Sequence, residues 1–379
     1  MSNDNLLMVA DSERDANMLY AVGMFVPDPF IYFRFAGRGH VVLSDLEVDR
    51  GRKQAAHCRV ISLSQCGRKL KQRHNSNGHA IGLAQVIRLL ARQNGIRKFV
   101  VPSSFPHGLA RDLRELKVRV KVRPGSFFPE REVKTSAEVK KISAALMMAE
   151  VGMSEGIQAL KSSKIGPGGK LLYHNVPLTS EKLRSIIDTA ILQAGGIASH
   201  TIVAGGRQGC DPHEVGFGPL RAHQPIILDV FPRSQKTGYF GDITRTVVKG
   251  RATEEVRRLY QTVRRGQELA FSMVRARERG ARIHSAVQEF FQREGYKTGR
   301  RKGRFEGFFH GTGHGLGLEI HEAPRLAASS ESVLRAGHVL AVEPGLYYPS
   351  IGGVRLEDVA LVTAEEPKNL TKFEKVLEV

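Results

Sequence analysis

Short apolar runs alternate with amphipathic stretches along the first third of the chain. The segments FIYFRFAGRGHVVLS, KFVVPS and VRVKV predict strands, and the first of them folds back on itself at a glycine turn. Apolar residues recur at helical spacing from Ile81 to Leu90, and Gly95 predicts the end of that helix. The segment LARDLRELK predicts another helix. This alternation of strands and helices indicates a smaller α/β domain over residues 1–128.

A different pattern begins at Thr135, which forms a predicted capping box with Glu138 ahead of a long amphipathic helix. The preceding segment FFPEREVKT is the predicted linker. The rest of the chain repeats one pattern twice, in which two helices are followed by strands. The helices are expected near 136–161, 180–194, 254–276 and 284–294. The strands are expected at TIVAGG, PIILDVF, FGDITRTVVKG, FFHGTGHGLG, HVLAVEPGLYY and GGVRLEDVALVT. We therefore expect an α+β domain over residues 129–379, made of two related helix-and-sheet halves about a pseudo-two-fold axis.

Length and charge add to this picture. A chain of 379 residues suits two domains. Its net charge of +19 is uneven, because residues 51–111 hold twelve Lys or Arg and no acidic residue, and KTGRRKGR forms a second basic run. Such a surface could hold nucleic acid or an acidic partner. Neither run interleaves aromatic residues as a base-stacking surface does, so a solvated basic surface is favoured and no nucleic-acid partner is expected.

The N-terminal segment, the length of the apolar runs and the cysteine content predict a cytoplasmic protein. The N-terminus, MSNDNLLMVADSERD, is acidic where a secretory signal needs a basic flank, and no apolar run is long enough to cross a membrane. Three cysteines, Cys58, Cys66 and Cys210, share no metal-ligand spacing and leave one unpaired in any disulfide scheme. They suit a reducing compartment and are expected to have no role in function.

Four carboxylates fall within apolar segments. Asp229 ends IILDVF and Asp242 lies in GYFGDITRTVV, so a hairpin would bring both to the same end of a sheet. Glu343 and Glu357 lie in two of the apolar strands expected later in the chain. A single buried carboxylate is often a structural partner, and Arg355 could neutralise one of these. Four together need more positive charge, which two divalent metal ions would supply.

Three histidines accompany a run of glycines in HGTGHGLGLEIHE. His310 and His314 are four residues apart but are interrupted by glycines, so they do not form the helical H-E-x-x-H zinc motif. A lone histidine here would be read as structural, whereas His310, His314 and His321 together indicate a site. Dense glycines let the main chain pass close to a ligand or substrate. Carboxylates with imidazole and no thiolate favour manganese, iron, cobalt or zinc over copper.

Four segments, GDITRT, GTGHGLGLEIHE, VEPGLY and RLED, resemble in their order those of the pita-bread metallopeptidases. That family includes methionine aminopeptidase, aminopeptidase P, prolidase and the metal-free creatinase. The resemblance covers about Lys134 to the C-terminus and implies a pita-bread fold there, preceded by a creatinase-like N-terminal α/β domain. It implies five metal ligands, namely Asp229, Asp242, His314, Glu343 and Glu357.

The same resemblance implies roles for residues around the ligands. His213, in CDPHEVGF, would line the substrate pocket, and either His213 or His310 would stabilise the oxyanion together with a metal. His310 and His321 would handle the scissile carbonyl and proton movement. Glu343 would carry the proton to the leaving nitrogen, and Arg355 lies beside the last ligand.

The N-terminal domain narrows the implied activity, because methionine aminopeptidase lacks it. The resemblance implies a dinuclear metal-dependent exopeptidase that removes the first residue of peptides with proline in the second position, an Xaa-Pro aminopeptidase. The alternatives are an Xaa-Pro dipeptidase (prolidase) with the same site and a non-peptidase creatinase-like or nucleic-acid-binding relative. The implied cofactors are two divalent ions, manganese first, with cobalt, zinc or iron as alternatives. A homodimer is implied, and VFPRSQKTGYFG is two residues longer than is usual in the family.

Overall fold

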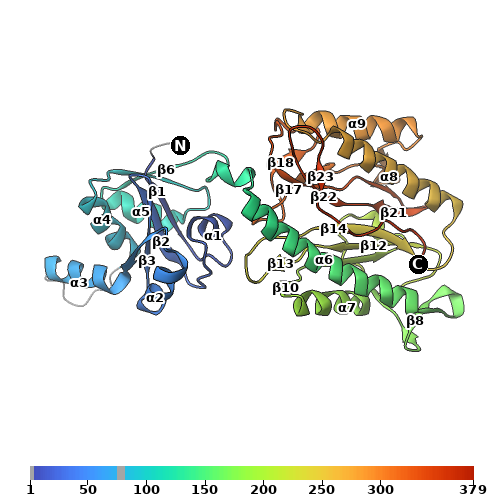
Figure 1. Cartoon of the computed structure of the whole chain (residues 1–379), viewed down its shortest axis with the longest axis horizontal. Coiled ribbons are helices and arrows are strands. Elements are labelled where there is room, and N and C mark those ends of the chain that lie inside the picture. The colour runs from blue at the N-terminus through green and yellow to red at the C-terminus, as the bar shows by residue number, and fades with distance from the viewer. Residues whose placement is uncertain (1–3, 75–81) are drawn as a thin grey trace. The chain divides into compact units, whose positions relative to one another are not determined.

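The computed structural model describes residues 4–74 and 82–379. It divides into two compact units, Met1–Pro129 and Glu130–Val379. Each unit has its own strands and helices (Figure 1). Each also has its own apolar core.

The first unit is built on a six-stranded sheet with the strand order β4-β3-β2-β1-β5-β6. The strands are β1 (Leu6–Ala10), β2 (Phe30–Phe35), β3 (Arg38–Leu43), β4 (Arg59–Ser62), β5 (Lys98–Val101) and β6 (Arg119–Val122). The helices are α1 (Ala16–Val22), α2 (Asp45–Gln54), α3 (Leu63–His74), α4 (Leu83–Gln93) and α5 (His107–Glu115). β2 runs antiparallel to β1 and β3, whereas the other pairs are parallel.

The first strand, β1, is buried on both faces. Leu6 and Met8 belong to the apolar core on one face, and Leu7 and Val9 belong to the core on the other. A strand covered on both faces is apolar throughout, which is why LLMVA shows no alternation. The strands and helices predicted in this part of the sequence are present as β2, β3, β5, β6, α4 and α5. The predicted helix position Ile81 lies outside the described residues.

The second unit begins with α6 (Ser136–Ser162), whose capping box is confirmed. The Thr135 N–H donates to Glu138 Oε2 at 2.9 Å, and the Glu138 N–H donates to Thr135 Oγ1 at 3.3 Å. The first half continues with β7 (Lys164–Ile165), β8 (Leu171–Tyr173), β9 (Val176–Pro177), α7 (Ser180–Gln193), β10 (Gly196–Ile197), β11 (Ile202–Gly205), β12 (Pro225–Val230), β13 (Arg233–Ser234) and β14 (Ile243–Val248).

The other half repeats the order of helices followed by strands. Its helices are α8 (Glu254–Met273) and α9 (Gly280–Arg293). Its strands are β15 (Gly299–Arg301), β16 (Arg304–Glu306), β17 (Gly313–Gly315), β18 (Glu322–Leu326), β19 (Val339–Val342), β20 (Gly345–Tyr348), β21 (Gly352–Arg355), β22 (Asp358–Leu361) and β23 (Lys368–Asn369). The main sheets are β11-β12-β14 in the first half and β18-β17-β19-β22-β23 in the second.

Each half packs its two helices together in the same way. A Cβ added at Gly152 of α6 would lie 2.7 Å from Ile191 of α7, and one added at Gly266 of α8 would lie 2.5 Å from Phe291 of α9. In both pairs a glycine on the first helix lets a large apolar side chain of the second approach closely. In Figure 1, α6 and α7 lie along one side of the strands of this unit, and α8 and α9 lie along the other.

The predicted strands around the carboxylates need correction. β19 ends at Val342 and β20 begins at Gly345, so Glu343 lies in a break between strands and not inside one. Glu357 lies in a similar break between β21 and β22, and Asp242 directly precedes β14. The two strands on either side of each break belong to different sheets. A residue at the point where the chain passes from one sheet to another can direct its side chain away from both sheets.

None of the described helices is long and apolar enough to cross a membrane. All three cysteines are free and buried. Burial raises the pKa of the Cys58 thiol to about 11 and that of Cys210 to about 12, which keeps both thiols protonated.

Candidate metal centre

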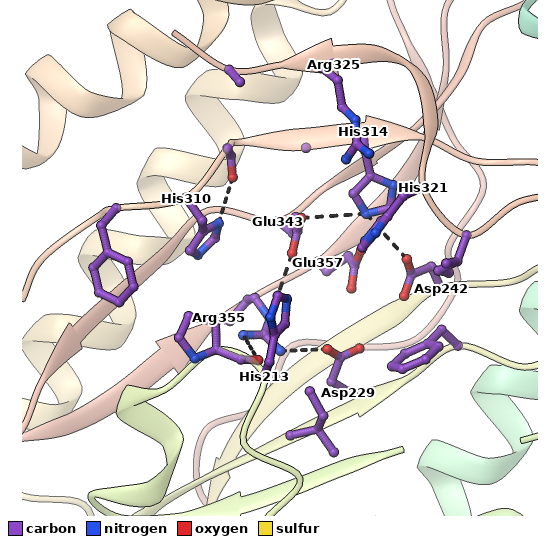
Figure 2. A pocket seen from close by; sticks show the side chains of 18 of the residues that line it. His213, Asp229, Asp242, His310, His314, His321, Arg325, Glu343, Arg355 and Glu357 are labelled. Carbon is purple, nitrogen blue, oxygen red and sulfur yellow. Dashed lines mark hydrogen bonds and ion pairs between the residues drawn. The ribbon is translucent and has the colours of Figure 1, made fainter. Parts of the chain in front are cut away.

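A cavity of about 580 Å³ opens in the second unit (Figure 2). Residues from both halves line it: Asp229 comes from β12, Asp242 precedes β14, and the other predicted ligands follow α9. Every site residue predicted from the sequence lines this cavity, namely His213, Asp229, Asp242, His310, His314, His321, Glu343, Arg355 and Glu357.

Pairing of β12 with β14 positions the two aspartates. The strands are antiparallel with Asp229 opposite Thr244 and Val230 opposite Ile243. Asp242 therefore follows at the end of the sheet where Asp229 lies. The register thus brings the two carboxylates to one end of the sheet.

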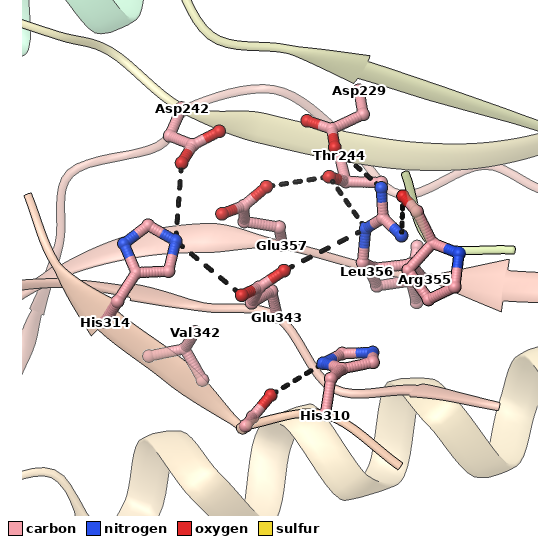
Figure 3. Close-up of polar contacts among 12 residues, drawn as sticks. Asp229, Asp242, Thr244, His310, His314, Val342, Glu343, Arg355, Leu356 and Glu357 are labelled. Atoms are coloured by element: carbon pink, nitrogen blue, oxygen red, sulfur yellow. Dashed lines mark hydrogen bonds and ion pairs between the residues drawn. The ribbon is translucent and has the colours of Figure 1, made fainter. Parts of the chain in front are cut away.

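Three of the predicted ligands lie within reach of one ion. Asp242, His314 and Glu357 each offer a ligand atom, and these atoms lie within 4.8 Å of one another. His314 Nε2 is 3.7 Å from Asp242 Oδ2 and 3.6 Å from Glu343 Oε1 (Figure 3). Asp229 has a different partner, because its Oδ2 accepts a hydrogen bond from Arg355 Nη2 at 2.6 Å.

Two buried carboxylate oxygens in the cavity lack hydrogen-bond partners. They are Asp229 Oδ1 and Glu357 Oε1. The other Glu357 oxygen accepts from Thr244 Oγ1 at 2.7 Å. A buried acceptor without a partner is costly, and bound divalent cations would supply the missing partners. The residues present therefore fit metal ions with oxygen and nitrogen ligands.

Burial and like charge set the protonation of the carboxylates. Burial, with the nearby Glu357, raises the pKa of Asp242 well above its usual value. Burial, with the nearby Glu343, does the same for Glu357. Burial raises the pKa of Glu343 to about 7 against the opposing charge of Arg355. The protein alone thus disfavours the ionised forms of Asp242, Glu343 and Glu357, and bound cations would reverse that preference.

His314 is prepared as a neutral ligand. Burial, with the nearby His321, lowers its pKa to about 3. Its Nδ1 lies 3.1 Å from the Gly315 carbonyl oxygen, which can only accept, so the proton is on Nδ1. The lone pair of Nε2 then faces Asp242 and Glu343, as a metal ligand requires.

Tyr347 and Thr244 form hydrogen bonds with residues of the site but are not among those predicted from the sequence. Tyr347 Oη lies 2.8 Å from His310 Nε2 and accepts from Arg355 Nη1 at 3.1 Å. Burial raises the pKa of Tyr347 to about 12, so its hydroxyl is protonated and donates to His310. The available signal was a polar side chain inside each of the segments VEPGLY and GDITRT.

The remaining histidines differ in their surroundings. Burial lowers the pKa of His310 to about 3, and its Nδ1 donates to the Gly311 carbonyl at 2.7 Å. The His321 ring packs edge-on against His314 with centroids 4.3 Å apart. His213 is exposed at the cavity wall. Arg325, which was not predicted, is also exposed and lines the cavity.

The glycines on either side of His314, Gly313 and Gly315, allow neighbouring strands to pack closely. A Cβ at Gly313 would lie 2.0 Å from the Ala341 carbonyl oxygen, and one at Gly315 would lie 2.2 Å from that of Ala323. Both contacts are with main chain, which cannot move aside cheaply. Glycine at these positions therefore lets β17 sit between its two neighbours.

We expect Gly313→Ala to lower the free energy of unfolding by about 1–3 kcal/mol, because the added methyl group pushes β17 from β19. Urea unfolding followed by circular dichroism measures the change. Gly299→Ala is the control, since a Cβ there meets no atom within 4 Å. Equal effects of the two substitutions would show that close packing at Gly313 is unimportant.

Comparison with known proteins identifies the family. Residues 140–364, more than half of the chain, match metallopeptidase family M24. The chain belongs to metallopeptidase family M24. It is therefore a hydrolase of a family that uses divalent metal ions, as the sequence predicted.

Individual relatives and solved structures resemble the chain over most of its length. An Xaa-Pro dipeptidase of Pyrococcus horikoshii is 29% identical over 291 residues, which cover 75% of each chain. The solved structure of an Xaa-Pro dipeptidase from Bacillus anthracis has a TM-score of 0.82 at 24% identity and covers 99% of this chain and 95% of its own. That of an X-Pro aminopeptidase from Thermotoga maritima has a TM-score of 0.81 at 19% identity and covers 99% and 98%. These likenesses confirm the predicted pita-bread fold preceded by an N-terminal α/β domain.

Proposed function

We propose that this M24 peptidase is an Xaa-Pro aminopeptidase, which removes the first residue of peptides with proline in the second position. The observation that carries the proposal is a cavity where four carboxylates and a neutral imidazole converge and two carboxylate oxygens lack partners. A relative named Xaa-Pro dipeptidase and a structural neighbour named X-Pro aminopeptidase support specificity for proline. The complete set of ligand-capable residues argues against a non-peptidase, creatinase-like relative.

The proposed cofactors are two divalent ions, with manganese the first choice. The ligands would be Asp229, Asp242, His314, Glu343 and Glu357, all of which line the cavity. When bound, the ions would polarise the scissile carbonyl and lower the pKa of the attacking water. Asp229 and Glu343 both form ion pairs with Arg355, so each of these carboxylates would be shared between metal and the guanidinium.

The remaining residues would bind and orient substrate. Glu343 lines the cavity beside the other proposed ligands, so its carboxylate is placed to carry a proton to the leaving nitrogen. His213 is exposed and free to meet the carbonyl oxygen, whereas Tyr347 and the Gly311 carbonyl fix the ring of His310. Arg355 would hold Asp229 in place through their ion pair.

Cleavage of dipeptides alone, as by a prolidase, is the second candidate. Arg325 favours dipeptidase activity, because this exposed cation lines the cavity and its side chain forms no ion pair with the described residues. A dipeptide places its carboxylate one residue from the scissile bond, where such a cation would attract it. A homodimer, a cytoplasmic location and the lack of nucleic-acid or membrane partners stay predictions from the sequence.

The deciding experiment compares matched substrates. Purified protein loaded with manganese, its metal content measured, is assayed on Xaa-Pro, Xaa-Pro-Yaa and Xaa-Ala-Yaa peptides. We expect release of the first residue from Xaa-Pro-Yaa, loss of activity on chelation and little cleavage after Xaa-Ala. Cleavage of Xaa-Pro alone would make the protein a dipeptidase, and no cleavage of either proline peptide would refute the proposal.

We expect Tyr347→Phe to lower kcat about tenfold with a small change in KM, because His310 loses the donor that orients its ring. Steady-state kinetics on an Xaa-Pro-Yaa peptide measures both constants. Tyr348→Phe is the matched control, since the Tyr348 hydroxyl donates to the Lys297 carbonyl and does not line the cavity. An equal loss in the two variants would exclude a specific role for Tyr347.

A further inference from the structure

The predicted linker FFPEREVKT contains two buried cations. Arg131 is 7% exposed and Lys134 is 6% exposed. Segments that only join two domains are usually exposed and polar, because few contacts cross them. Charged side chains are almost never fully buried without a partner. The burial of these two cations therefore indicates that the segment does more than join the two units.

Both cations bind the carboxylate of Glu322, the first residue of β18. Lys134 Nζ donates to Glu322 Oε1 at 2.5 Å, and Arg131 Nη2 donates to Glu322 Oε2 at 2.9 Å. The same Nη2 donates to Glu319 Oε2 at 2.8 Å. The side chain of Glu322 is 9% exposed, so these charges are largely shielded from water. The four residues form an ion network made of Arg131, Lys134, Glu319 and Glu322.

The loop that carries His321 lies next to this ion network. It joins β17 to β18 over residues 316–321. His321 lines the cavity and packs edge-on against His314, as Figure 2 shows. Glu322 directly follows His321 in the chain, and Glu319 precedes it by two positions. Among the described residues that line the cavity there is no member of the ion network, so the network reaches the cavity through this loop.

The main chain of the loop packs directly against the carboxylate of Glu322. A Cβ added at Gly317 would lie 2.6 Å from Glu322 Oε1. The Gly317 N–H donates to the Glu319 carbonyl at 3.2 Å, and the Gly317 carbonyl accepts from the Phe240 N–H at 2.9 Å. Phe240 lies two residues before Asp242. The loop is therefore held between the ion network on one side and the segment that leads to a proposed ligand on the other.

Burial of these charges is a poor source of stability. The free-energy cost of taking charged groups out of water often equals or exceeds their mutual attraction. In some proteins buried ion pairs instead favour one conformation over its alternatives. A network that joins residues 188 positions apart beside a single loop is suited to that second role. The position of the loop matters for catalysis, because a displacement of about 1 Å can slow a reaction roughly 10²-fold.

We propose that Lys134 and Glu322 are positioning residues, which hold the loop so that the ring of His321 stays against His314 in the cavity wall. This inference rests on the proposed peptidase function, in which His321 acts on the bound substrate. Arg131 contributes to the same hold by binding Glu319 and Glu322 together. The segment that opens the second unit thereby helps to set the geometry of the active centre.

Lys134→Met tests the proposal in the full-length protein, because methionine has a similar length but cannot donate to Glu322. With the manganese-loaded protein and an Xaa-Pro-Yaa peptide, we expect kcat to fall roughly tenfold, while KM and metal content stay near those of wild type. Lys134→Arg keeps a donor and should recover most of the rate. In a His321→Asn background, Lys134→Met should change kcat by less than about twofold, because its effect passes through His321.

Hydrogen exchange of the metal-free protein gives a measurement that does not depend on activity. Lys134→Met should speed the exchange of amides in residues 316–321 while α8 and α9 stay protected. Glu322→Gln keeps the shape of the side chain and removes its charge, so it should show the same loss of kcat and faster exchange, and it replaces Lys134→Met if that variant does not fold. Arg335→Gln is the control, since it breaks an ion pair to Glu132 of the same segment and should change neither quantity.

Three results would overturn the proposal. The first is unchanged exchange of the loop in Lys134→Met, and the second is an equal loss of kcat with and without His321. The third is loss of metal from Lys134→Met, because the network would then act on a ligand and not on His321. If wild type cleaved no Xaa-Pro-Yaa peptide, the proposed function would be refuted, whereas the exchange measurement would still decide whether the ion network holds the loop.

Discussion

Asp242→Asn is expected to lower kcat/KM by roughly 10³-fold and to reduce the bound metal. Asp242 is 4% exposed, and its carboxylate lies with His314 and Glu357 in the group that can hold an ion. Asparagine has nearly the same volume but no charge, so it weakens attraction for a divalent cation while leaving the packing intact. Kinetics on an Xaa-Pro-Yaa peptide and elemental analysis of the purified protein measure the two effects.

Asp188→Asn is a suitable control for this experiment. Asp188 is a partly buried carboxylate of α7 that accepts a hydrogen bond from Thr201 and does not line the cavity. Its replacement should leave metal content and rate close to those of wild type. If Asp242→Asn kept its metal and its full rate, the assignment of the metal centre would be wrong.

Arg245→Met is expected to lower the free energy of unfolding by about 3–5 kcal/mol. Arg245 is 1% exposed, and its Nη2 donates to Asp358 Oδ1 at 2.8 Å. Its guanidinium also donates to four carbonyl oxygens, those of Thr244, Glu357, Phe373 and Glu374. Methionine fills much of the same space but leaves a buried carboxylate and several acceptors without this donor. Urea unfolding followed by tyrosine fluorescence suits a chain without tryptophan.

The control for Arg245 is another cation on the same carboxylate. Lys375 pairs with Asp358 Oδ2 but is 21% exposed, so water can replace much of its contribution. Lys375→Met should therefore lower the stability much less than Arg245→Met does. If the two variants were equally destabilised, the carbonyl contacts of Arg245 would have no special importance.

Arg245 also bears on the metal centre. Its Nη1 donates to the Glu357 carbonyl, and its Nε and Nη2 hold the carbonyls of Glu374 and Phe373 in the C-terminal segment. These hydrogen bonds hold the C-terminal segment next to Glu357, which lies between β21 and β22. Loss of stability in Arg245→Met should consequently be accompanied by weaker metal binding.

Local patterns of the sequence were enough to determine much of this protein. The capping box at Thr135 depends on residues three positions apart, so it could be read directly and is present. The hairpin of β2 and β3 depends on a short glycine turn and is present too. The order of GDITRT, GTGHGLGLEIHE, VEPGLY and RLED was sufficient to predict the family, because each segment carries the residue types that its chemistry requires.

Only the tertiary structure decided which partner each polar group meets. Arg355 was one of several possible partners for the carboxylates, and it pairs with Asp229, 126 positions away. Thr244 meets Glu357 across 113 positions, and Tyr347 joins His310 to Arg355. Such pairs depend on how strands of different sheets lie against each other, which apolar periodicity does not specify.

The same reason explains the misplaced strand ends. An unbroken apolar segment around Glu343 or Glu357 looks alike whether it forms one long strand or two strands in different sheets. The breaks arise where the chain passes from β19 to β20 and from β21 to β22, and they direct the two glutamates into the cavity. The sequence by itself predicted a set of residues that all line one cavity, and the packing of the two halves determined how they face one another.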